Sequence, residues 1–117
     1  MPQPVDQEFF ARLAELNEKF AQRLPDTLAQ LAAQSQLLAA GAPAAPANEL
    51  QGILHTLAGS AATFGFRGVG HQARLLEQRL RVLRTFEQTA AADWQAWRAE
   101  LDEFIAAARK DPKGLPG

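Results

Sequence analysis

The sequence contains no cysteine and only two histidines, His55 and His71, among its 117 residues. Without cysteine the chain can form no disulfide framework, no thiolate metal site and no thiol nucleophile. Two histidines are also too few for a multi-histidine metal site. These absences exclude thiol enzymes and argue against a resident metal centre, so we expect no metal ligands on this chain.

Long apolar runs and a strong charge of one sign are missing too. No segment has about eighteen consecutive apolar residues, so no membrane span is predicted. The start "MPQPVDQEFF" lacks the basic and apolar regions of a signal peptide. The net charge of −1 leaves no basic excess for nucleic-acid phosphates. We therefore expect a cytoplasmic protein that binds neither membrane nor nucleic acid. Met1 suggests a complete product, although one domain cut from a longer chain would look the same.

β-branched residues are few, while alanine, leucine, glutamine and arginine dominate, which favours helices over strands. Apolar residues recur at helical spacing in four segments. The four stripes are Phe9, Leu13, Leu16, Phe20, Leu24, Leu28 and Leu31; Leu50, Ile53, Leu54, Leu57, Ala61 and Phe64; Val69, Ala73, Leu76, Leu80 and Leu83; and Trp94, Trp97, Leu101, Phe104, Ile105 and Ala108. We expect all four to face one core, which predicts an all-α, antiparallel up-down four-helix bundle formed by residues 1–117 as a single domain.

Capping and helix-breaking residues set the expected helix boundaries. Asp6 and Asp93 are predicted N-caps of the first and last helices. Pro25 predicts either a kink in a long first helix or a break that leaves an extra N-terminal helix. Gly65 and Gly68 are expected to break the chain between the second and third helices.

The segment "GAPAAPAN", residues 41–48, is predicted to be a loop, because its glycine and two prolines would end the first helix. Asn48 would then cap the second helix, with Gln51 as the partner in a capping box. The ordered core is expected over about residues 6–109. Residues 110–117, "KDPKGLPG", are expected to form a flexible tail.

His55 is predicted to face away from the apolar stripe of its helix. At about 100° per residue, the stripe falls within about 60° of Leu50, whereas His55 falls at about 140°. Gly52, Gly59 and Ala62 fall at about 120–200°, so they surround His55 on the solvent face. A glycine in a helix costs about 1 kcal/mol relative to alanine. Either the glycines clear the surface for a macromolecular partner, or both are tolerated surface glycines.

No acidic residue lies between Glu49 and Glu77, and Arg67 and Arg74 fall in that window. The positive region suits an anionic group or an acidic partner, although a solvated helix face would look the same. No carboxylate lies within one helical turn of His55 to activate the ring. "GFRGVG" lacks the lysine and hydroxyl of a nucleotide phosphate loop. Any chemistry at the imidazole therefore needs groups from a partner, and no ATP-dependent kinase activity is expected.

The segments "HTLAGSAATFG" and "GVGHQARLLE" resemble the histidine-containing phosphotransfer (HPt) domains of phosphorelays. That family has a histidine, a leucine two residues on, a basic residue three on, glycines four and ten on, and then an alanine and a leucine-glutamate pair. The corresponding residues are His55, Leu57, Ala58, Gly59, Gly65, Ala73, Leu76 and Glu77. The resemblance spans roughly residues 9–108. It departs from the family at Ala58, where a lysine or arginine is usual.

This resemblance implies a four-helix bundle in which exposed His55 takes a phosphoryl group from a receiver-domain aspartate and passes it to another receiver. The receiver would supply the acidic pocket and Mg²⁺, so no cofactor is expected on this chain. Response-regulator receiver domains are the expected partners, with a hybrid histidine kinase as a further candidate. The expected partner-binding residues are Gly52, Thr56, Ala58, Gly59, Ala62, Arg67 and Arg74.

The alanine at position 58 keeps alternatives open, because it removes charge from the bundle side of the reaction. Arg67 or Arg74 could replace that charge, or transfer could be slow. A non-catalytic docking or scaffold module would instead bind receiver or kinase domains without transfer. A plain structural bundle is the third alternative. His71 lies outside the motif and is expected to be an ordinary surface histidine. The composition favours a bacterial source, and a monomer is expected.

Overall fold

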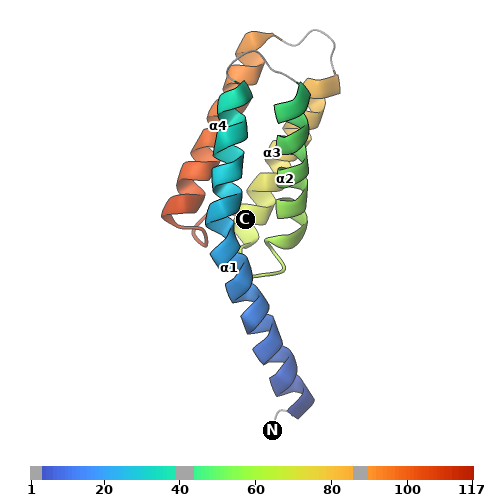
Figure 1. Cartoon of the computed structure of the whole chain (residues 1–117), viewed down its shortest axis with the longest axis vertical. Helices are drawn as coiled ribbons and strands as arrows, with labels where there is room; N and C mark the ends of the chain where they lie inside the picture. The colour runs from blue at the N-terminus through green and yellow to red at the C-terminus, as the bar shows by residue number, and fades with distance from the viewer. Residues whose placement is uncertain (1–3, 39–43, 86–89) are drawn as a thin grey trace.

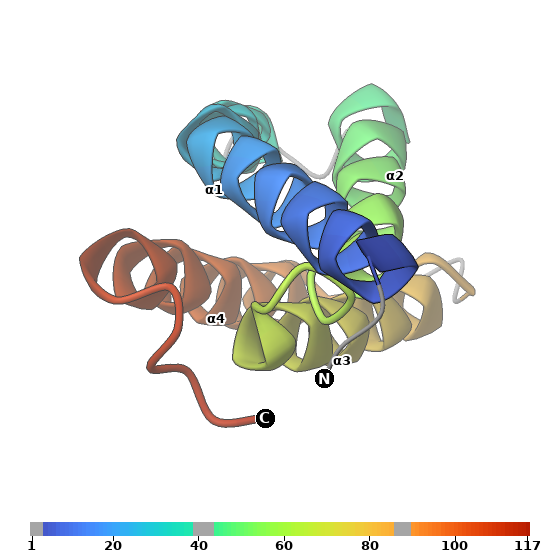
Figure 2. The ribbon, with the colours of Figure 1, turned by 90° about the horizontal axis from the view of Figure 1, so that it is seen from below.

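The computed structural model describes residues 4–38, 44–85 and 90–117. These residues form the helices α1 (Pro4–Leu38), α2 (Ala44–Ser60), α3 (Arg67–Thr85) and α4 (Ala91–Lys110). Both α1 and α3 pack against α2 and α4, and successive helices run in opposite directions (Figure 1). Seen from below, α1 and α2 form one layer over α4 and α3 (Figure 2). The predicted all-α, antiparallel four-helix bundle is confirmed.

Leucine side chains from all four helices fill the core. Leu31, Leu50, Leu80 and Leu101, one from each helix, have no exposed surface. Burying a leucine side chain contributes roughly 1.5–3 kcal/mol, so these contacts dominate the stability of the bundle. The indole nitrogen of Trp97 also donates a hydrogen bond of 2.9 Å to the carbonyl oxygen of Leu76, which ties α4 to α3.

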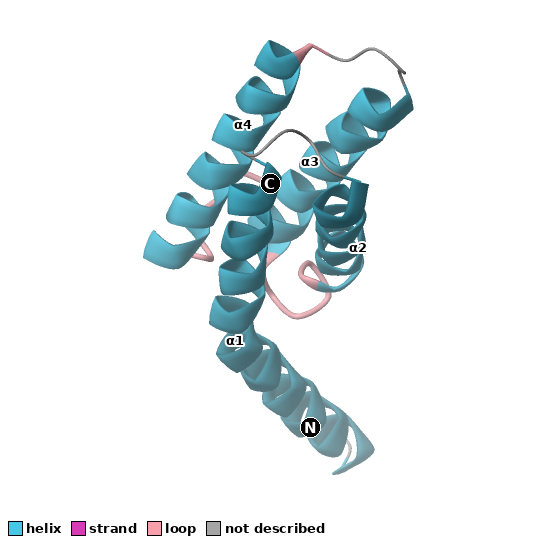
Figure 3. Cartoon of the chain, turned by 45° about the horizontal axis from the view of Figure 1, so that its top comes forward, coloured by secondary structure: helices cyan, strands magenta, loops and turns pink. Residues whose placement is uncertain are grey.

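The N-terminal half of α1 projects beyond the bundle (Figures 1 and 3). Its side chains Phe9 and Leu16 are 61% and 43% exposed, so the prediction that they lie in the core is wrong. Farther along the same stripe, Leu24 is buried. Pro25 lies inside the helix, which continues through it and curves where its N-terminal half leaves the bundle. Periodicity predicts which face of a helix is apolar, but not whether another helix covers that face.

A glycine turn connects α2 to α3. Gly65 has a φ of +93°, a conformation that glycine adopts without steric cost. The amide of Phe66 donates to the carbonyl of Ala61 at 2.8 Å, and that of Gly65 donates to the carbonyl of Ala62 at 3.3 Å. These two bonds form a Schellman motif, which ends α2 and directs the chain back along it as α3.

The C-terminal tail, expected to be flexible over 110–117, packs against the start of α3. Leu115 is partly buried against the core, and the side-chain amide of Gln72 donates to the carbonyl of Pro116 at 3.2 Å. Gly68 was predicted to break the chain, but it lies buried in α3. A Cβ at that position would overlap the carbonyl group of Leu115, so the glycine allows the tail to pass close to the helix.

The predicted N-caps are displaced from the observed helix starts. Asp6 and Asp93 lie inside the first turns of α1 and α4, and Asn48 lies one turn inside α2. Pro46 is in the first turn of α2, where a missing N–H group breaks no intrahelical hydrogen bond. The predicted loop at 41–48 is wrong for residues 44–48, which begin α2, and its residues 41–43 lie outside the described residues. Polar residues that can cap a helix also occur in its first turn, so the sequence does not distinguish the two positions and the predicted helix starts are displaced.

Candidate functional site

His55 stands on the outer face of α2, with its side chain 69% exposed. Gly52 and Gly59 lie one turn before and after it. A Cβ built on either glycine would meet no other atom within 4 Å, apart from the backbone of its own helix and chain neighbours. The helical angles therefore predicted the direction of this face correctly. Packing within the described chain gives no reason for either glycine.

Glu77 of α3 holds the imidazole ring from the neighbouring helix. Its two carboxylate oxygens lie 3.0 and 3.2 Å from Nδ1 of His55, and its side chain is only 7% exposed. An ionised carboxylate only accepts hydrogen bonds, so Nδ1 carries the proton and donates. In the neutral ring, Nε2 then has the free lone pair. The contact thus fixes both the orientation of the ring and the nitrogen that can act as a nucleophile.

The buried carboxylate of Glu77 is itself paired. Nη2 of Arg81, one turn farther along α3, lies 2.7 Å from Oε1 of Glu77. This pair compensates the carboxylate charge, because a buried charge without a partner would be costly. The result is a chain of contacts from Arg81 through Glu77 to His55.

Glu77 matches the family pattern in sequence, but its contact with His55 is not evident there. No carboxylate lies within one turn of His55 on its own helix, and Glu77 is 22 residues away. The register of the two antiparallel helices is the feature of the sequence that predicts this contact. His55 and Glu77 are each eleven residues from Phe66, which lies in the connecting turn. Antiparallel neighbours joined by a short turn bring such equidistant positions side by side.

A shallow hollow beside the histidine contains two guanidinium groups. Nη1 of Arg84 donates to the side-chain oxygen of Gln51 at 2.6 Å, and Nη2 donates to that of Asn48. Arg81 lies one turn before Arg84 on α3. The residues lining the hollow are Asn48, Gln51, Gly52, His55, Glu77, Arg81 and Arg84. Guanidinium groups bind anionic oxygens well, so the hollow suits an anion at the imidazole.

The structure separates the predicted partner-binding residues into different environments. Thr56 and Ala62 are exposed, as a contact surface requires. Ala58 is only 8% exposed and belongs to the core, so the expectation that it faces a partner is wrong. Arg67 and Arg74 are exposed on α3, but they do not line the hollow. Arg81 and Arg84 line it instead.

An apolar groove between α1 and α2 borders the same face. Gly52 and Thr56 form part of its edge, and Phe20, Ile53 and Phe64 contribute apolar surface. The imidazole therefore stands between a charged hollow on one side and an apolar groove on the other. This combination can receive a folded partner that presents an anionic group surrounded by apolar residues.

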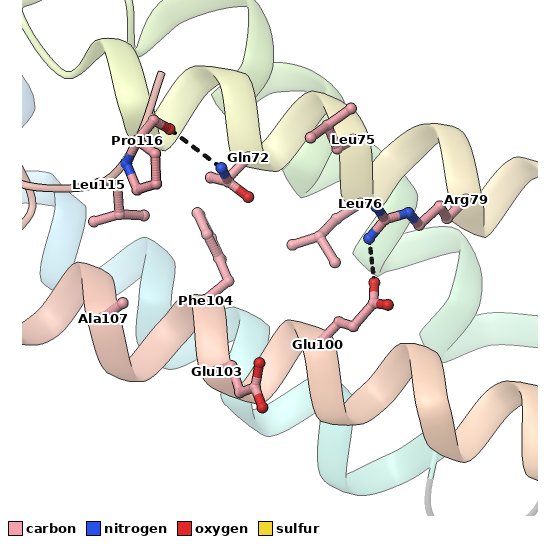
Figure 4. Close-up of a pocket in the computed structure, with 10 residues that line it drawn as sticks. All are labelled: Gln72, Leu75, Leu76, Arg79, Glu100, Glu103, Phe104, Ala107, Leu115 and Pro116. Atoms are coloured by element: carbon pink, nitrogen blue, oxygen red, sulfur yellow. Dashed lines mark hydrogen bonds and ion pairs between the residues drawn. The ribbon is translucent and has the colours of Figure 1, made fainter.

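A third depression lies between α3 and α4 (Figure 4). Arg79 and Glu100 pair across one part of it, and Gln72 contacts the tail at the other end. Phe104 and Leu76 point into the space between. The depression contains no histidine, so it does not add to the chemistry of the His55 site.

Two kinds of feature are absent from the part of the chain that the structure describes. Within residues 4–38, 44–85 and 90–117, no three histidine, aspartate or glutamate side chains gather in a group that could hold a metal ion. No described helix is long and apolar enough to cross a membrane. The ionisable groups that line the hollow are the imidazole of His55, the carboxylate of Glu77 and the guanidinium groups of Arg81 and Arg84.

A family model for the Hpt domain matches residues 8–111, which is most of the chain. Comparisons with curated proteins and with solved structures returned no match. The matched range includes every residue of the His55 site, and the four-helix architecture agrees with it. The chain belongs to the Hpt domain family, the histidine phosphotransfer modules of two-component systems.

Proposed function

We propose that His55 accepts a phosphoryl group from the aspartyl phosphate of a response-regulator receiver domain and passes it to the aspartate of another. The observation that carries this proposal is an exposed imidazole whose Nδ1 is hydrogen-bonded to Glu77, which leaves the lone pair of Nε2 free. Membership of the Hpt family supports the same assignment. A hybrid histidine kinase is a further candidate donor, through its own receiver domain. These partners would place the chain in the cytoplasm.

The transfer step uses Nε2 as the nucleophile. Its lone pair forms an N–P bond while the P–O bond to the donor aspartate breaks, and the aspartate leaves as a carboxylate. The phosphorylated ring keeps its proton on Nδ1 and carries a positive charge. The carboxylate of Glu77, 3.0 Å away, stabilises that charge. The second receiver aspartate reverses the step by attacking the phosphorus, and His55 leaves as the neutral ring.

The partner would supply the groups that this chain does not provide. Phosphoryl transfer depends mainly on positioning and on positive charge around the phosphoryl oxygens. We infer that a receiver contributes Mg²⁺ and an acidic pocket, because the one carboxylate that contacts His55 within the described residues is already hydrogen-bonded to the ring. No cofactor on this chain is required by this scheme.

The arginines of α3 replace the charge that the alanine at position 58 lacks. Arg81 and Arg84 line the hollow beside His55, and both guanidinium groups come from α3 rather than from the histidine helix. Guanidinium groups bind phosphoryl oxygens through paired N–H donors. We assign them to hold the phosphoryl group or the acidic rim of the receiver during transfer.

A second candidate is a docking module that binds receiver or kinase domains without transfer. The observation that favours it is the buried, uncharged side chain of Ala58, where the family usually has a basic residue. The same exposed face, with Gly59 and the apolar groove, would serve such a module. Binding and chemistry must therefore be measured separately.

The test is to incubate the purified chain with a small panel of phosphorylated receiver domains and Mg²⁺, and to follow acid-labile label. Wild type and His71→Gln should become labelled, whereas His55→Gln should not. The two substitutions are matched, since His71 is also exposed on a helix. Label that remains in His55→Gln would refute the proposed acceptor. Receiver binding without any label would favour the docking module.

A further inference from the structure

The projecting half of α1 carries an apolar stripe that the bundle does not cover. Phe9 and Leu16 are exposed, Leu13 is partly exposed, and Phe20 lies where the helix reaches the bundle. No other described helix runs beside this half of α1 in Figures 1 and 3. A contiguous exposed apolar surface usually marks a place where another molecule binds.

The stripe is symmetric along the helix. Its order is Phe, Leu, Leu, Phe at positions 9, 13, 16 and 20, with steps of four, three and four residues. Alternating steps of three and four are the spacing of a coiled-coil seam. In an antiparallel pair, Phe9 lies opposite Phe20 of the second copy, and Leu13 lies opposite Leu16. A surface that matches itself in this way fits a two-fold dimer.

The charges along α1 favour the same orientation. Asp6 and Glu8 lie at the N-terminal end of the stripe, whereas Lys19 and Arg23 lie at the other end. Antiparallel pairing places opposite charges at each end, with Asp6 near Arg23 of the second copy. Parallel pairing would align like charges and would bring both bundles to the same end. Over residues 6–23 there are four acidic and three basic side chains, so two copies do not repel strongly.

From these observations we propose that two copies of the chain associate through the stripe of Phe9, Leu13, Leu16 and Phe20 as an antiparallel helix pair, with the two bundles at opposite ends. Phe20 already lies 5.4 and 5.3 Å, between ring centroids, from Phe64 and Phe66. Phe9 of the second copy would extend this aromatic cluster. The proposal replaces the expectation of a monomer.

The dimer would be weak and would approach the groove between α1 and α2. The paired segment is about 20 Å long, so it buries less area than a permanent interface. With Asp6 opposite Arg23, the second helix would extend past Phe20 along the groove that Phe20 and Arg23 line, whereas His55 lines the separate charged hollow. The proposal rests on the residues of α1 and does not depend on the function assigned to His55.

Sedimentation velocity of the full chain, across a concentration series from about 10 µM to 1 mM, tests the association. The wild-type chain should change from monomer to dimer as its concentration rises. Leu16→Glu should raise the dissociation constant about tenfold or more, because it places a carboxylate in the seam. Ala11→Glu adds the same charge to the opposite face of α1 and should change the constant by less than about twofold. Circular dichroism verifies that both variants fold.

The orientation is tested with spin labels, which is simple because the chain has no native cysteine. Labels at Asp6→Cys and Arg12→Cys would both flank the seam. A label at position 6 should lie about 26 Å along the axis from its symmetry mate, whereas labels at position 12, near the centre, should be only about 8 Å apart along it. A parallel pair would bring both kinds of label close and would overturn the proposed arrangement. A wild-type chain that stays monomeric, or whose stripe binds phospholipid vesicles instead, would overturn the dimer itself.

Discussion

At the scale of single residues, Glu77 determines which nitrogen of His55 is free to react. We predict that Glu77→Ala lowers the rate of phosphoryl transfer about tenfold or more, because the ring loses its fixed orientation and tautomer. Glu77→Gln should keep the tautomer, since the amide oxygen can still accept the hydrogen bond from Nδ1, but it should transfer more slowly than wild type because a neutral amide does not stabilise the positive ring. Phosphoryl-transfer assays quenched at successive times give the rates, and ¹⁵N NMR of the imidazole gives the tautomer. A merely structural role for Glu77 would not alter the tautomer.

Arginine variants of α3 provide the matched control for this prediction. Arg81→Ala removes the partner of Glu77 and should slow transfer, whereas Arg79→Ala should not, because Arg79 pairs with Glu100 on the side facing α4. The two variants lose the same charge from the same helix. A Glu77→Ala chain that keeps both the wild-type tautomer and the wild-type rate would contradict the positioning role.

Some properties of single residues can be predicted from the sequence and others cannot. The angle of His55 on its helix predicted its exposure, because that angle depends only on local geometry. The contact with Glu77 depends on the register between two helices, which periodicity does not give. The burial of Ala58 was missed for a similar reason. At about 80° from the stripe centre it lies at the edge of the apolar face, and the packing of neighbouring helices decides such borderline positions.

At the scale of elements, substitutions of Gly52 and Gly59 in α2 should affect the stability of the helix and the transfer reaction differently. We predict that Gly52→Ala raises the free energy of unfolding by up to about 1 kcal/mol, because alanine favours a helix and open space surrounds the position. Gly59→Gln should also leave the fold intact, since its side chain would point into open space. That side chain would crowd His55, so receiver binding and transfer should fall. Urea denaturation and the transfer assay measure the two effects.

These glycine variants discriminate between the two interpretations of the surface around His55. If Gly59→Gln transfers at the wild-type rate, the glycine is a tolerated surface residue and clears no path for a partner. A fall in transfer with unchanged or increased stability supports access as the reason for the glycine. Loss of folding in either variant would contradict the open surroundings described for both positions.

The four helices themselves were predictable because their apolar stripes repeat over many residues. The same rule failed for the first half of α1, where Phe9 and Leu16 continue the stripe beyond the bundle. Local periodicity contains no information about the length of the neighbouring helices. In this fold α2 has 17 residues and α1 has 35, so half of α1 has no neighbour within the described chain.

At the scale of the whole molecule, the C-terminal tail closes one end of the bundle. Proline and glycine in "DPKGLPG" predicted disorder, since they disfavour helix and strand. The tail is ordered by tertiary contacts that composition does not reveal. Lys113 lies 5.5 Å from the ring centroid of Phe66, and Leu115 covers part of the core beside the buried Gly68. Residues from the tail and from the α2–α3 turn therefore meet at the start of α3.

The closure by the tail can be measured with a double-mutant cycle between Gly68 and Leu115. Leu115→Ser should lower the free energy of unfolding by about 1 kcal/mol, because half-buried apolar surface is lost. Gly68→Ala should have a similar effect in the wild type, because the new Cβ would overlap the backbone of the tail and displace it. In the Leu115→Ser background the tail is already loosened, so Gly68→Ala should cost less, with a coupling of about 0.5 kcal/mol or more. Gly52→Ala, on the far side of α2, should be additive with Leu115→Ser and serves as the control. Additive effects of Gly68→Ala and Leu115→Ser in urea denaturation would show that the tail does not stabilise the bundle through this contact.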